Sequence, residues 1–79
     1  MEGRKLCDVA REIRADWKNV HFGAEPYLTA MESLGTVDDH YFFEDGRSIV
    51  LYFLANASSW RGAVAKRVKA ELKEMLKRK

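Results

Sequence analysis

Apolar residues recur at three- and four-residue steps in two long stretches of the chain. In residues 4–19 they are Leu6, Val9, Ala10, Ile13 and Trp17. In residues 60–77 they are Trp60, Val64, Val68, Leu72, Met75 and Leu76. Charged residues fill most positions between them, so each stretch predicts an amphipathic helix with one buried face. Ser58 or Ser59 is the expected N-cap of the second helix.

Two shorter helices are expected between these. Pro26 suits the first turn of a helix over residues 24–34, because a proline lacks an N–H that would have no partner there. Residues 48–56 are apolar on nearly every side, which predicts a central buried helix. We expect Ser48 to cap its start and Asn56 to end it with a positive φ. A buried strand is also compatible with this apolar run.

Residues 36–47 show no clear period. Tyr41, Phe42 and Phe43 have strand composition, but the sequence offers no second strand, so we interpret them as a loop that covers the core. The whole pattern predicts a single all-α domain over residues 1–79. It is a compact bundle of about four helices, at 4–19, 24–34, 48–56 and 60–77, with an aromatic and acidic loop at 36–47.

The composition is that of an ordinary globular chain, with 47% hydrophobic and 33% charged residues. A chain of 79 residues buries one modest core and leaves little room for a deep catalytic pocket. Cys7, the single cysteine, cannot form an intramolecular disulfide, and the apolar run at 49–55 is too short to span a bilayer. Because its start also lacks an apolar leader, we expect a cytoplasmic protein.

The net charge of +2 conceals a polarity along the chain. Residues 1–20 carry a net +1, residues 21–47 a net −5, and residues 48–79 a net +6. Opposite charges on successive segments favour ion pairs within or between chains before they favour nucleic acid.

The sequence offers no catalytic or metal-binding pattern. No Cys–His, Ser–His–Asp or glycine-rich phosphate-binding motif occurs at a meaningful spacing. His21, His40 and Cys7 do not form a zinc set. The acids of residues 38–45 lack the spacing of an EF-hand. We therefore expect a non-enzymatic protein with no cofactor and no metal site.

Two segments have the composition of a protein-binding surface. Residues 38–45 place aromatic anchors among carboxylates, as in the core and rim of protein interfaces. The corner at 58–62 combines serine hydroxyls, helix N–H groups and a guanidinium, which could also hold an anion. The residues expected to contact a partner protein are Asp39, Tyr41, Phe43, Glu44, Trp60 and Arg61.

Both segments also have a purely structural interpretation. The aromatic loop could cap the core and pair with the last helix. The corner could be a capped helix start that Trp60 locks, with Arg61 paired to an acid of the loop. Gly62, unfavourable inside a helix, suggests the close approach of another backbone or a ligand.

The basic last helix supports an alternative function. Nucleic-acid binding would use Arg61, Lys66, Arg67, Lys69 and Lys73. Glu71 and Glu74 interrupt this series of charges in the sequence, which favours an ordinary solvated surface. A homodimer that packs this helix against its copy, through Val64, Val68 and Leu72, is a further possibility.

The run from Tyr52 to Gly62, Tyr-Phe-Leu-Ala-Asn-Ala-Ser-Ser-Trp-Arg-Gly, is continued by a basic amphipathic helix. With Asp45-Gly46-Arg47-Ser48-Ile49-Val50 and the segment at 26–31, it resembles a group of small phage and integrative-element proteins. The resemblance covers most of the chain and implies an origin in mobile genetic elements, with no activity attached. Small proteins of such elements often bind a host or phage protein, including defence nucleases that they inhibit.

Overall fold

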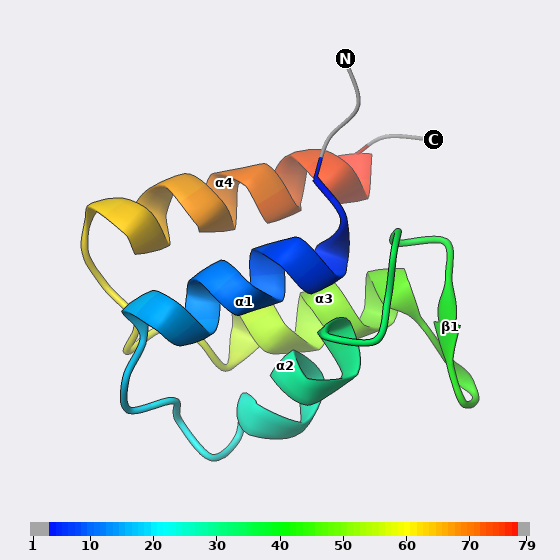
Figure 1. Ribbon diagram of the computed structural model, residues 1–79, viewed down its shortest axis with the longest axis horizontal. Helices are drawn as coiled ribbons and strands as arrows, with labels where there is room; N and C mark the ends of the chain where they lie inside the picture. The colour runs from blue at the N-terminus through cyan, green and yellow to red at the C-terminus, as the bar shows by residue number, and fades with distance from the viewer. Residues whose placement is uncertain (1–3, 78–79) are drawn as a thin grey trace.

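The computed structural model describes residues 4–77, which form four helices and a two-stranded hairpin. The elements are α1 (Leu6–Asp16), α2 (Glu25–Met31), β1 (His40–Tyr41), β2 (Glu44–Asp45), α3 (Gly46–Ala55) and α4 (Ala63–Lys77). In Figure 1, α1 lies between α4 and α2, α3 lies behind it, and the hairpin stands at one end. The four predicted helices are confirmed, whereas the all-α class omits the hairpin.

Each helix contributes one face to a shared core. From α1, Leu6, Val9, Ala10 and Ile13 are buried, and from α4, Ala65, Val68 and Leu72. Val64, Met75 and Leu76 lie partly buried at the edge of this core. The apolar periods of the two long helices therefore predicted their buried faces.

Three aromatic rings fill the core at the end where α1 finishes and α4 begins. The Trp17 and Trp60 rings stack with centroids 5.8 Å apart, and Phe53 meets both edge-on. The Trp60 indole N–H donates to the Asp16 carboxylate over 2.8 Å. We call Trp17, Phe53 and Trp60 the core aromatic cluster.

The start of α3 differs from the prediction. The helix begins at Gly46, and the carboxylate of Asp45, not the hydroxyl of Ser48, caps it by accepting the Ser48 N–H over 2.8 Å. Gly46 is required because a Cβ there would lie 2.8 Å from the Val37 carbonyl oxygen. The chain before α3 thus packs directly on its first turn.

Helix ends also differ from the expected ones. α1 ends at Asp16 and α2 at Met31, three residues short of each predicted end. Asn56 ends α3 with a φ of −107°, so the positive φ expected there is wrong.

The start of α4 shows what Gly62 does. The helix begins at Ala63, so Ser58 and Ser59 lie too early in the chain to be its N-cap. Gly62 has a φ of +116°, a conformation that side chains rarely adopt, and nothing lies within 4 Å of a Cβ built there. Its backbone conformation, and not a close approach, explains the glycine.

The helix predicted to be buried on every side is buried on one. Ile49, Val50 and Phe53 of α3 lie in the core, but Leu51 is 55% exposed and Tyr52 46% exposed. α3 packs on α2 and α4, and its remaining face is open to solvent.

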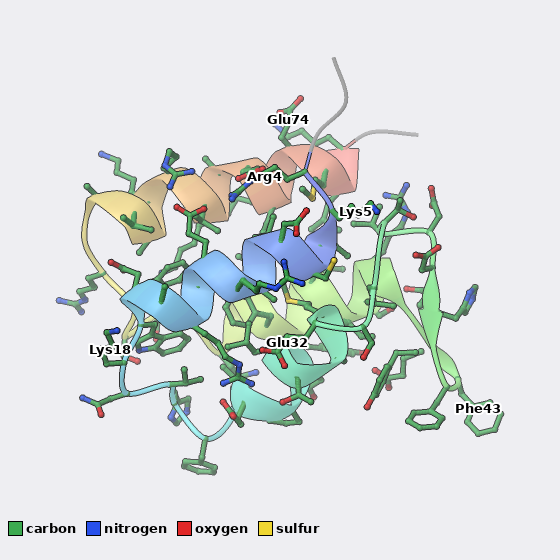
Figure 2. All side chains as sticks on the ribbon, in the orientation of Figure 1. Arg4, Lys5, Lys18, Glu32, Phe43 and Glu74 are labelled. Carbon is green, nitrogen blue, oxygen red and sulfur yellow. The ribbon has the colours of Figure 1, made fainter. Side chains whose placement is uncertain are left out.

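Ion pairs join α1 to both of its neighbours. Arg4, labelled in Figure 2, pairs with Glu71 of α4 and Glu12 of α1, and Arg67 of α4 also pairs with Glu12. These pairs lower the pKa of Glu12, Arg4 being the main cause. Ion pairs within the fold thus neutralise part of the charge polarity of the sequence.

On its other side, α1 neutralises part of the acidic segment. The Arg14 guanidinium pairs with Glu25 and Glu32 and donates to the Thr29 hydroxyl, all on or next to α2.

No helix of residues 4–77 is both long enough and apolar enough to span a membrane.

A candidate protein-interaction surface

The hairpin presents two phenylalanines at its tip. His40 pairs with Asp45 and Tyr41 with Glu44 in antiparallel register, which leaves Phe42 and Phe43 as a two-residue turn. Phe42 has a φ of +59°, the one positive φ among the described non-glycine residues. A positive φ at the first central position alone is the pattern of a type II′ turn, where glycine is usual.

These phenylalanines do not cover the core. Phe42 is 83% exposed and Phe43 is fully exposed, whereas Tyr41 is half-buried. The interpretation of the three aromatics as a core-covering loop is therefore wrong for the two at the tip. Figure 2 shows Phe43 projecting into solvent at the edge of the molecule.

A shallow apolar hollow lies beside the tip. Its volume is about 350 Å³, near the lower limit of ligand pockets, and it opens between α2, the hairpin and α3. The residues that line it are Pro26, Tyr27, Ala30, Tyr41, Phe42, Phe43, Glu44 and Ile49. We call this hollow together with its two phenylalanines the hairpin surface.

The acids around the hairpin differ in what they do. The Asp39 carboxylate accepts the N–H groups of Gly35 and Thr36, which lower its pKa. Likewise, the Ser48 N–H lowers the pKa of Asp45. Both carboxylates therefore hold the segment in place.

Asp38 and Glu44 complete the set of acids. Asp38 pairs with Arg47. Glu44 forms no ion pair with any described residue and lines the hollow. It is thus the hairpin carboxylate best placed to meet a partner.

The corner at 58–62 lies far from this surface. In Figure 1 the hairpin stands at the end of the molecule opposite the turn that joins α3 to α4. Trp60 is 2% exposed and belongs to the core aromatic cluster, so its ring is not available to a partner. Arg61 is exposed, and it forms no ion pair with any acid of the described residues, so the expected pair with a loop acid is wrong. The structure therefore separates Trp60 and Arg61 from the other predicted contact residues.

Two of the predicted nucleic-acid contacts are already engaged. Arg67 pairs with Glu12, and the Lys69 ammonium donates to the carbonyls of Ala57 and Trp60 over 2.8 and 2.7 Å. Burial lowers the pKa of Lys69, and the neighbouring charges of Lys73 and Arg61 add to this effect. Lys69 therefore stabilises the turn before α4.

The other basic residues of α4 form a row. At 100° per residue, Lys66, Lys73 and Lys77 lie within about 40° of one another on the helix. All three are exposed. Glu71 points away from this row, toward Arg4. Glu71 therefore does not interrupt the basic face of the helix, although it interrupts the series of charges along the sequence. Glu74 is the one acid of the described part of α4 that lies beside this face.

Two of the three residues named for a possible dimer contact on α4 are not available to a copy. Val68 and Leu72 are fully buried within the chain, against α1, and cannot also pack against a copy.

Residues 4–77 contain no group of three or more His, Cys, Asp or Glu side chains placed to hold a metal ion.

Sequence reasoning missed Pro26 and Tyr27 as lining of the hollow and Leu51 and Tyr52 as exposed apolar residues. The sequence did contain a signal for the exposure of Leu51 and Tyr52, because a helix that is apolar on every side needs more cover than a chain of this size provides.

No protein-family model, curated protein or solved structure matches the chain. The resemblance to phage and integrative-element proteins therefore stays a prediction.

Proposed function

We propose that this protein is a non-enzymatic binding protein that docks on another protein through the hairpin surface. The observation that carries the proposal is the exposure of Phe42 and Phe43 at the tip of a hairpin whose base is held by hydrogen bonds. Burial of one large apolar side chain contributes about 1.5–3 kcal/mol, which is a strong reason for such residues to be covered in a complex. Large aromatic side chains are also the commonest energetic anchors of interfaces.

The conformation of Phe42 supports the same conclusion. A positive φ costs a residue with a side chain roughly 1–2 kcal/mol, and glycine would avoid this cost. Strained residues of this kind concentrate at functional sites, because the strain persists only where another requirement outweighs it. The adjacent hollow supplies a place for a partner's apolar side chain, and Glu44 lies at its rim.

The partner that we propose is a host or phage protein. This chain would inhibit that protein or link it to another one, and a defence nuclease is one such target. The proposed origin in a mobile element and the proposed cytoplasmic location follow from the sequence resemblance and from the single free cysteine, Cys7.

The test is capture of a partner from a bacterial host lysate, with nuclease added to remove nucleic acid bridges. We expect the wild-type chain to retain a stoichiometric protein and the double variant Phe42→Ser with Phe43→Ser to lose it. Phe22→Ser is the matched control, because Phe22 is 85% exposed but lies outside the hairpin. Equal capture by the double variant and the wild type would contradict the proposal.

Nucleic-acid binding is a second candidate, favoured by the row of Lys66, Lys73 and Lys77. Three phosphate contacts predict that affinity for duplex DNA falls roughly 40-fold between 50 and 200 mM salt. Fluorescence anisotropy with a labelled duplex measures this dependence, and Lys66→Glu with Lys73→Glu should weaken binding and reduce the dependence on salt. Affinity that does not respond to salt or to these substitutions would exclude this candidate.

A further inference from the structure

The hairpin surface continues onto α3. The Tyr52 ring lies against the Tyr27 ring, with centroids 5.4 Å apart, and Tyr27 lines the hollow. Leu51, the residue before Tyr52, is also exposed. An apolar band therefore runs from Phe43 at the hairpin tip, through Tyr27, to the open face of α3.

The open face of α3 has the spacing of a helix-packing surface. Leu51, Tyr52 and Ala55 are exposed, and Ser48 lies half-buried one turn earlier. These positions recur at three- and four-residue steps, which is how one helix presents a ridge to another. They include no charged side chain, and Leu51, Tyr52 and Ala55 remain exposed although Tyr27 of α2 lies against Tyr52.

The charge beside this band is mainly negative. Residues 38–45 include four acids and no lysine or arginine. Arg47, the one lysine or arginine of positions 21–47, pairs with Asp38 and donates to the Leu76 carbonyl over 2.9 Å, so it offsets one of these four acids. Glu44 faces the hollow without a cation from the described chain. A partner's cation would therefore complement this edge.

We infer that the partner presents a positively charged amphipathic helix to this band. Its apolar face lies on Leu51 and Tyr52, one large apolar side chain enters the hollow, and a lysine or arginine lies beside Glu44. The inference rests on the proposed function and specifies the chemistry of the partner. It combines helix-in-groove recognition with complementary charge.

The test uses a random phage-displayed library of helical peptides about 16 residues long, enough for four turns. It is selected on the immobilised full-length protein, with Leu51→Ser/Tyr52→Ser for counter-selection. We expect the enriched peptides to carry a net positive charge and apolar residues at i, i+3 or i+4, and i+7. Enrichment of neutral or acidic peptides, or of none, would overturn the inference.

Two charge-reversal variants then locate the electrostatic contact. A synthetic copy of an enriched peptide should bind Glu44→Lys roughly three- to ten-fold more weakly than the wild type, as expected for an exposed ion pair that is reversed. Glu74→Lys is the matched control, because it makes the same charge change on α4, away from Phe43 (Figure 2). Equal weakening by both variants would show a general charge effect and overturn the contact with Glu44.

Failure of this inference can be told apart from failure of the proposed function. If capture of the lysate partner depends on Phe42 and Phe43 but peptide selection lacks the cationic pattern, the surface is correct and its occupant is wrong. If capture does not depend on these phenylalanines, the proposed function itself is wrong.

Discussion

The chain contains two groups of three aromatic residues, and they have opposite environments. Trp17, Phe53 and Trp60 lie in the core, with ring contacts among all three. Tyr41, Phe42 and Phe43 lie on the hairpin, where two of the three rings are exposed. Similar side chains thus stabilise the fold in one place and remain available for binding in the other.

The difference arises from the backbone around each group. Helices α1, α3 and the turn before α4 converge on the core aromatic cluster, and Asp16 satisfies the indole N–H of Trp60. The hairpin is held instead by hydrogen bonds at its base, among them the one from the Gly46 N–H to the Asp39 carbonyl over 2.7 Å. At its tip, the Phe42 ring meets the Tyr41 ring edge-on with centroids 4.7 Å apart, and both phenylalanines are exposed. A substitution should therefore affect stability in one group and binding in the other.

The largest effect is expected at Trp60. Trp60→Ala removes the ring stack with Trp17 and leaves a cavity, which should lower the free energy of unfolding by roughly 3–5 kcal/mol. Urea unfolding followed by circular dichroism measures this loss. Trp60→Phe, which retains a ring but leaves Asp16 without its donor, should cost less, and equal losses for the two variants would contradict the packing argument.

Gly46→Ala should have the next largest effect, because it disturbs the base of the hairpin. The new methyl group would lie within 3 Å of the backbone of Thr36 and Val37, so we expect a loss of about 1–3 kcal/mol. Gly35→Ala is the control, since its Cβ meets only the end of the Asp39 side chain, at 3.1 Å. If thermal unfolding showed equal losses for both variants, the close approach at Gly46 would not be the cause.

Phe42→Asn should separate stability from binding. Asparagine tolerates a positive φ, so the substitution should raise the free energy of unfolding by roughly 0.5–1 kcal/mol. The same substitution should weaken partner capture, because it removes an exposed ring. A variant that was less stable than the wild type in urea would show that the Phe42 ring contributes to the fold.

The smallest expected effect is the loss of hairpin stability in acid. The folded-state pKa of Asp45 lies below its usual value of 3.8, so its stabilisation is present above pH 3.8 and is lost as the pH falls through the lowered pKa. NMR signals of the hairpin should therefore change in acid before the Trp17 and Trp60 indole signals do. Asp45→Asn retains a capping side chain that does not titrate, so acid should affect this variant's hairpin less. Simultaneous changes at both sites would contradict this order.

Sequence periodicity predicted the helices and the buried faces of α1 and α4, because a face that must be buried leaves a regular apolar pattern. It could not predict the hairpin, whose strands are two residues each and depend on Asp45 and Gly46 packing against the preceding segment. Hydrophobicity also could not distinguish Trp60 from Phe43. Burial of an aromatic residue depends on which elements converge on it, and the hydrophobicity of the chain does not indicate which elements those are.

The most direct test of binding through the hairpin surface measures stability and partner capture on the same preparation of Phe42→Ser with Phe43→Ser. We expect a free energy of unfolding within about 0.5 kcal/mol of the wild type, as for exposed positions in general, together with loss of the captured partner. A loss of several kcal/mol would show that the hairpin phenylalanines support the fold. Unchanged stability with unchanged capture would show that they are not the binding surface.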